Sequence, residues 1–128
     1  MEKERLEMSF SSLPEYLSSL DDKGKDYTLR FIKLIENEYP ALKPRISFSM
    51  PMWWFKEKMK DGYIGVSATK LRFTLHLSSE PYIREIEKDR PDLKYGKQCV
   101  SISYNKEEDF LFFEKKAKEF ITYNIKGL

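Results

Sequence analysis

The spacing of hydrophobic residues changes along the chain from a helical period to a period of two and then back. From a cap at Asp21 or Asp22 to about Glu38, apolar residues recur every three or four positions, which predicts a helix stopped by Pro40. Apolar and polar residues then alternate, which predicts strands at 45–50, 63–68, 71–77 and 99–104. Strict alternation is typical of a sheet that is packed on one side only.

Capping signals place the remaining helices. Ser12 with Glu15 three residues later forms a capping box and predicts a short first helix, and Ser79 predicts a helix toward Lys88. Asn105 is the expected cap of the last helix. The order of elements predicts an α+β, two-layer fold, with one mainly antiparallel sheet and helices from both chain ends packed on one face. We expect residues 1–10 to be a flexible segment and residues 11–128 to form a single domain.

The segment Arg45–Trp54 holds both tryptophans of the chain. Alternation places Ile46, Phe48 and Met50 on the core face of the first strand, and Met50-Pro51 is expected to lead into a bend. Trp53 and Trp54 lie past that bend and cannot face the same way. One is expected to pack inward and the other to line an edge or a pocket.

Composition narrows the class of protein. The chain has 128 residues, 41% of them hydrophobic, which fits one domain with a real core. Its formal net charge of +2 argues against a dedicated nucleic-acid binder. Cys99 is the only cysteine, so neither an intrachain disulfide nor a cysteine-rich zinc site is expected. The absence of a signal-like or membrane-length apolar run predicts a cytoplasmic protein without a membrane partner.

The alternation leaves one sheet face polar. Its expected members are Arg45, Ser47, Ser49, Tyr63, Ser67, Arg72, Thr74, His76, Ser101 and Ser103. This face is either simply solvated or a shallow pocket for a small anionic or hydroxylated ligand, with the arginines supplying charge. The candidate ligand-binding residues are Arg45, Ser49, Trp53, Trp54, Lys70, Arg72, Thr74 and His76.

Catalytic and metal chemistry have weaker signals. His76 has the chemistry of a general base or a metal ligand, but no motif fixes a nucleophile or an orienting partner, so we do not expect an enzyme. Cys99 is either a reactive thiol or a packing residue. Three acidic groups contain the oxygens that iron or calcium needs, but two of them fall in first turns of helices, where capping explains them. Their members are Glu2, Glu4 and Glu7; Asp21, Asp22 and Asp26; and Glu107, Glu108 and Asp109.

Three short segments resemble the YdhG-like family, a bacterial family of unknown function, over roughly residues 13–121. They are Ile46-Ser-Phe48-Ser49-Met50-Pro51, Val66-Ser-Ala68-Thr-Lys70-Leu-Arg72-Phe-Thr-Leu-His76 and, more weakly, Lys97-Gln-Cys99-Val100-Ser101-Ile102. The chain departs from the family where Phe48-Ser49 replaces Tyr-Gly, Arg72 replaces a histidine, His76 replaces a tyrosine and Ser101 replaces an arginine. We therefore expect this chain to share the family's fold more closely than the chemistry of the family's polar face.

The resemblance implies a function, since some family members are described as frataxin-like intracellular iron chaperones. It implies a non-enzymatic iron chaperone or iron–sulfur accessory protein, with iron as a possible cofactor and no ligands that the sequence assigns. The residues themselves suggest an alternative, a module that binds a small molecule or a protein through the polar sheet face and the Met50–Trp54 rim.

Overall fold

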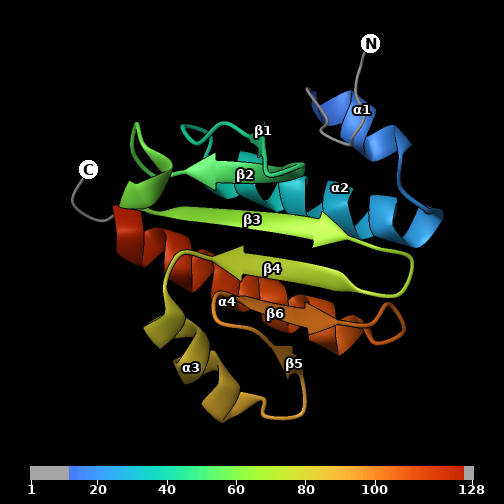
Figure 1. The fold of residues 1–128 in the computed structure, drawn as a ribbon, viewed down its shortest axis with the longest axis vertical. Coiled ribbons are helices and arrows are strands. Elements are labelled where there is room, and N and C mark those ends of the chain that lie inside the picture. The colour runs from blue at the N-terminus through green and yellow to red at the C-terminus, as the bar shows by residue number, and fades with distance from the viewer. Residues whose placement is uncertain (1–11, 126–128) are drawn as a thin grey trace.

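The structure, a computed structural model, describes residues 12–125, and the flexible segment predicted for residues 1–10 lies outside them. Six antiparallel strands form one sheet in the order β1-β2-β3-β4-β6-β5, and α2 and α4 cover one of its faces (Figure 1). The helices are α1 (Leu13–Ser18), α2 (Asp22–Glu38), α3 (Glu80–Asp89) and α4 (Glu107–Ile125), with a 3-10 turn at Met59–Asp61. The strands are β1 (Arg45–Ser47), β2 (Met50–Trp54), β3 (Tyr63–Ala68), β4 (Phe73–Leu77), β5 (Lys94–Tyr95) and β6 (Cys99–Ile102). The predicted α+β, two-layer fold is confirmed.

Two of the expected helix caps are present. Ser12 Oγ accepts a hydrogen bond from the Glu15 backbone N–H, and Ser79 Oγ accepts one from Tyr82. The cap predicted at Asn105 is wrong, because α4 begins at Glu107 and Asn105 lies in the preceding turn. Its side-chain oxygen accepts a hydrogen bond from Ser103 instead of binding the helix N-terminus.

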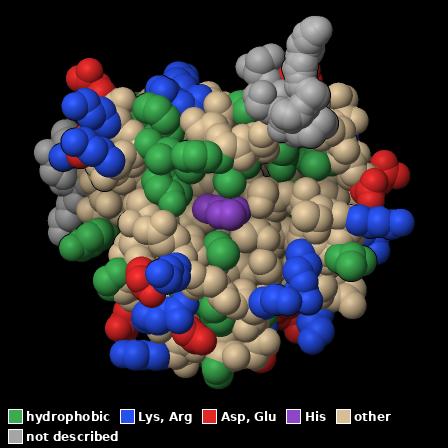
Figure 2. All heavy atoms as spheres, viewed as in Figure 1, with side chains coloured by type: hydrophobic (Ala, Val, Ile, Leu, Met, Phe, Trp, Pro, Cys, Tyr) green, Lys and Arg blue, Asp and Glu red, His purple; other side chains and the backbone are tan. Residues whose placement is uncertain are grey.

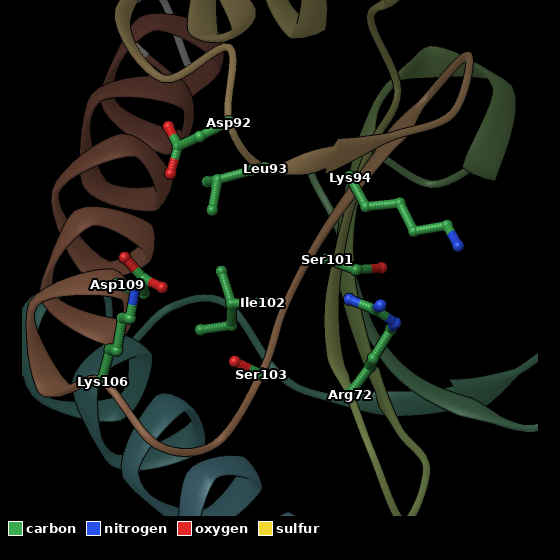
Figure 3. Close-up of a pocket in the computed structure, with 9 residues that line it drawn as sticks. All are labelled: Arg72, Asp92, Leu93, Lys94, Ser101, Ile102, Ser103, Lys106 and Asp109. Carbon is green, nitrogen blue, oxygen red and sulfur yellow. The ribbon is translucent and has the colours of Figure 1, made fainter.

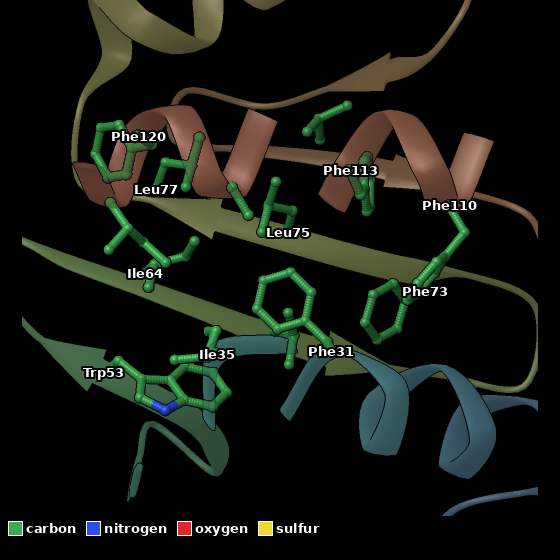
Figure 4. Packing of buried hydrophobic residues seen from close by; sticks show 14 of the residues in the cluster. Phe31, Ile35, Trp53, Ile64, Phe73, Leu75, Leu77, Phe110, Phe113 and Phe120 are labelled. Atoms are coloured by element: carbon green, nitrogen blue, oxygen red, sulfur yellow. The ribbon is translucent and has the colours of Figure 1, made fainter. Parts of the chain in front are cut away.

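The core lies between the sheet and the two long helices (Figure 4). Helix α2 contributes Phe31 and Ile35, and α4 contributes Phe110, Phe113 and Phe120. The sheet contributes alternate residues of its central strands, namely Trp53, Ile64, Val66, Phe73, Leu75, Leu77, Val100 and Ile102. Each such side chain stabilises the fold by about 1.5–3 kcal/mol when it is fully removed from water.

The first predicted strand is instead a β-hairpin. Phe48 and Ser49 form a two-residue turn between β1 and β2 with φ of +53° and +59°, as in the type I′ turns that suit hairpins. The prediction of Phe48 as a core residue is wrong, since it is 72% exposed. The predicted bend at Met50-Pro51 is also wrong, because β2 runs straight from Met50 to Trp54.

The hairpin reverses which residues of this segment face the helices. Ser47 pairs with Met50 and Arg45 with Met52, so these four residues share one sheet face. Met50 therefore lies on the open face and not in the core where it was predicted. Trp53 points into the core and is 1% exposed, whereas Trp54 is half-buried on the open face. One tryptophan packs inward, as expected.

Phe48 occupies a left-handed conformation that a bulky side chain adopts only at a cost. Phe48→Asn should raise the free energy of unfolding by about 0.5–1 kcal/mol, because asparagine tolerates this conformation and little packing is lost. Urea unfolding compares this variant with Phe48→Ala, which removes the ring but offers no such tolerance and should not stabilise. Equal stability of the two variants would contradict backbone strain at Phe48.

Two further strand boundaries differ from those predicted, and one short strand was not predicted. The fourth strand begins at Phe73, and Leu71, predicted to face the core, lies in a turn and is 74% exposed. The turn closes because the Thr69 backbone N–H donates to Arg72 O, and Tyr104 OH donates to the same oxygen. The last strand ends at Ile102 instead of Tyr104, and the two-residue β5 was not predicted.

Candidate functional site

The open face of the sheet is built from two rows of side chains. One row crosses five strands and consists of Arg45, Met52, Gly65, His76 and Cys99. The next consists of Ser67, Thr74, Ser101 and Lys94. Figure 2 shows this face, with the single histidine near its centre and hydrophobic side chains gathered over β1 and β2. The first row is thus rich in sulfur, and the second in hydroxyl groups.

Hydrogen bonds join residues of the hydroxyl row to each other and to His76 of the first row. His76 Nε2 and Ser67 Oγ are hydrogen-bonded at 2.9 Å, and Thr74 Oγ1 and Ser101 Oγ at 2.7 Å. Burial lowers the pKa of His76 from its ordinary value, which favours the neutral imidazole. These pairs fix the side chains in place, which favours a preformed surface.

At the β1–β2 end, Arg45 and Trp54 lie against each other. The Arg45 guanidinium sits 3.8 Å from the centroid of the Trp54 ring, a cation–π arrangement. Trp54 Nε1 is buried and has no hydrogen-bond partner among residues 12–125. The stacked pair lies at the β1–β2 edge of the face.

A pocket of about 380 Å³ opens at the other end, where the open face passes round β6 toward the start of α4 (Figure 3). Strand β5 pairs with β6 only at Lys94 and Tyr95, so the chain before Lys94 turns away and leaves this hollow. Arg72, Lys94 and Ser101 lie on the sheet side of β6, and Asp92, Lys106 and Asp109 on the helix side. Leu93, Ile102 and Ser103 complete the lining.

The two aspartates that line this pocket are paired with an arginine, whereas the three cations that line it have no carboxylate partner among the described residues. Arg90 donates from Nη2 to Asp109 Oδ1 at 2.7 Å and from Nε and Nη2 to both Asp92 oxygens at 2.9 Å. Arg90 lowers the pKa of Asp92 to about 2, which keeps that carboxylate charged. Within the described residues, Arg72, Lys94 and Lys106 have no carboxylate within 4 Å. The pocket is therefore electropositive, and its free donors are the three cations.

The structure separates the residues that the sequence predicted as one site. Arg72 lines the pocket, and Thr74 borders it through its hydrogen bond to Ser101. His76 lies mid-face, and Arg45, Ser49 and Trp54 lie at the β1–β2 end. Lys70 is exposed in the β3–β4 turn. Trp53, named among the candidate ligand-binding residues, packs against Phe31 in the core. Lys94, Lys106 and Arg90 were missed.

Of the acidic groups considered for iron, Glu2, Glu4 and Glu7 lie outside the described residues. The other two groups stand at helix starts or are partly paired with arginines. Arg30 binds Glu107 through its Nη1 at 3.0 Å, and Asp109 is bound by Arg90. Asp21 is the N-cap residue of α2 but its side chain makes no capping hydrogen bond, and Asp22 lies in the first turn. Over residues 12–125, no three histidine, cysteine, aspartate or glutamate side chains converge as a metal site would require.

Comparison with known proteins identifies the fold. No family model and no curated protein matches the chain. A solved structure does: the crystal structure of a DUF1801 family protein, YdhG, from Bacillus subtilis is similar with a TM-score of 0.68 and 25% sequence identity, over 87% of this chain and 88% of that one. The chain is an α+β domain whose open sheet face borders a basic pocket. More particularly, its fold is similar to that of YdhG. None of the helices in the described part has the length and apolar character to cross a membrane.

Proposed function

We propose that this YdhG-like domain is a non-enzymatic binding module for a small anion bearing phosphate or carboxylate groups. The observation that carries the proposal is the pocket beside β6, which is lined by three cations without carboxylate partners within the described residues. Guanidinium groups bind phosphate and carboxylate through paired charge-assisted hydrogen bonds, which suits Arg72 to this role.

Size and charge both support a small anion. About 380 Å³ lies at the lower end of the volumes of small-molecule sites. Arg90 holds both carboxylates of the lining, so an incoming anion meets Arg72, Lys94 and Lys106 and not two free acids. The proposal keeps the expected absence of catalysis, since the lining contains no paired nucleophile and base. We retain the cytoplasm as the proposed location.

The iron role that the resemblance implies has no comparable support. Iron sites in proteins use carboxylate, imidazole or thiolate groups converging on one point, and residues 12–125 contain no such group of three. The YdhG protein to which the chain is similar is described only as a DUF1801 family member. We therefore propose anion binding and not an iron chaperone.

Arg72→Gln should weaken the binding of pyrophosphate by about 10- to 100-fold, because a charge-assisted hydrogen bond contributes about 1.5–3 kcal/mol. Isothermal titration calorimetry at low ionic strength measures the change. Lys70→Gln is the matched control, since it removes one charge from the same turn but does not line the pocket.

Affinity should fall with added salt in the wild type, because exposed charges are screened. An unchanged affinity in Arg72→Gln, or an equal loss in Lys70→Gln, would overturn the proposal. No binding of pyrophosphate, phosphate or citrate by the wild type would do the same.

A further inference from the structure

Asp109 is the feature of the pocket beside β6 that anion binding alone does not explain. A carboxylate in the lining opposes every anion that enters, and the Asp109 side chain is only 6% exposed. Arg90 binds Asp109 Oδ1 at 2.7 Å, which offsets the charge but occupies one oxygen only. Asp92, the other carboxylate of the lining, has both of its oxygens bound by Arg90. Asp109 Oδ2 therefore differs from the other three carboxylate oxygens, because no residue among 12–125 donates a hydrogen bond to it.

This oxygen is open to solvent. Within residues 12–125, the fully buried side-chain atoms that lack a hydrogen-bond partner are Thr28 Oγ1 and Trp54 Nε1. Asp109 Oδ2 lacks a partner too but is not one of these buried atoms, so solvent reaches it. Asp109 lines the pocket of about 380 Å³, and the pocket is where a ligand meets this oxygen. A ligand that donates a hydrogen bond finds a charged acceptor there.

A cationic donor lies next to this acceptor. The Asp109 backbone N–H donates to Lys106 O at 3.1 Å, and this turn places both side chains at the start of α4, on the helix side of the pocket (Figure 3). Lys106 has no carboxylate within 4 Å among the described residues, so its ammonium group is available to a ligand. Arg72 lines the same cavity from the sheet side. The lining thus offers cationic donors together with one carboxylate acceptor.

We propose that the pocket selects inorganic phosphate that carries a proton, and that Asp109 is the residue that selects it; this inference rests on the anion binding proposed above. Inorganic phosphate keeps at least one P–OH group at neutral pH, so it accepts hydrogen bonds from the cations and donates one to Asp109 Oδ2. Sulfate is also tetrahedral but has no proton to donate at this pH, so its oxygens and the carboxylate repel each other. An acceptor that one anion satisfies and the other does not is a source of specificity.

The test is isothermal titration calorimetry of the full-length protein at pH 7 with sodium phosphate and sodium sulfate at equal ionic strength. The wild type should bind phosphate at least about tenfold more tightly than sulfate, which is the effect of one hydrogen bond to a charged group. Methyl phosphate separates free phosphate from a phosphate ester as the source of the group. Because it is mostly doubly ionised at pH 7, it should bind about tenfold more weakly than inorganic phosphate.

Two variants locate the selection. Asp109→Asn should bring the affinities for phosphate and sulfate to within about threefold of each other, because a neutral amide does not repel sulfate. Glu108→Gln is the matched control, since it removes the same charge from the same turn of α4 but does not line the pocket. It should keep the preference of the wild type. The comparison of the three anions in the wild type needs no variant, so it decides the matter even if Asp109→Asn does not fold.

The outcomes distinguish this inference from the proposed function. If the wild type binds phosphate and sulfate equally, or phosphate and methyl phosphate equally, the selection is overturned while anion binding stands. The same holds if a folded Asp109→Asn keeps the preference, or if Glu108→Gln loses it. A purely structural role of Asp109 toward Arg90 predicts a less stable variant with an unchanged ratio of affinities. Binding of none of these anions by the wild type would overturn both proposals.

Discussion

Trp53→Ala should lower the free energy of unfolding by about 3–5 kcal/mol, the range for removing a fully buried aromatic side chain. Trp53 is 1% exposed and lies 5.8 Å from Phe31 between ring centroids, in the layer between β2 and α2. The vacated volume cannot collapse easily, because both sides of it are secondary structure. Urea unfolding monitored by far-UV circular dichroism measures the loss.

Trp54→Ala is the matched control on the same strand. Trp54 is half-buried on the opposite face, where its ring contacts the Arg45 guanidinium. Its truncation should cost less than about 2 kcal/mol, from partial burial and a cation–π contact. A larger loss for Trp54→Ala than for Trp53→Ala would show that the faces of β2 are assigned the wrong way round.

Arg90→Met should lower the free energy of unfolding by about 3 kcal/mol at pH 7, because it leaves the Asp109 carboxylate buried without its partner. The Asp109 side chain is only 6% exposed, and Arg90 is the cation that binds it. Asp109→Asn in the same background should recover part of the loss, since the unpaired charge is then gone. Urea unfolding of the two single variants and the double variant gives the coupling.

The loss should also depend on pH. Arg90 lowers the pKa of Asp92 from 3.8 to about 2, so this pair stabilises the fold above pH 4 and ceases to do so as the pH falls through 2. The difference between wild type and Arg90→Met should therefore shrink on acidification. Lys88→Met, which removes an exposed pair with Glu85, should cost less than about 0.5 kcal/mol at any pH. A comparable loss in Lys88→Met would contradict a special role for Arg90.

Arg90→Met also bears on the pocket. Without Arg90, Asp92 and Asp109 face the cavity as uncompensated negative charges. Anion affinity should then fall even though Arg72, Lys94 and Lys106 are untouched. Arg90 therefore both stabilises the fold and keeps the pocket electropositive.

The sequence predicted those elements whose signals are local. Caps at Ser12 and Ser79, the stop at Pro40 and the alternation of β3 and β4 each depend on neighbouring residues, and each is confirmed in its main outline. The hairpin at Phe48-Ser49 was missed because neither residue is the glycine or asparagine that usually marks a type I′ turn. Alternation continues through the turn, so Arg45–Met50 reads as one strand.

That single error explains why the faces of β2 were not predicted. A two-residue turn reverses the parity of the strand that follows, so Met50, predicted in the core, lies on the open face. The pocket escaped prediction for a different reason. Lys94 and Lys106 line the same pocket as Arg72 only because β6 lies between β4 and β5. Strand β5 has two residues, too few for a periodic pattern that would predict this strand order.

The most direct test of anion binding is the titration of the ¹⁵N-labelled protein with pyrophosphate, followed by amide chemical shifts. We predict saturable shifts at Asp92–Lys94 and Ser101–Lys106 in the wild type, with the same shifts strongly reduced in Arg72→Gln. Shifts that are absent, that do not saturate, or that persist unchanged in Arg72→Gln would contradict the account.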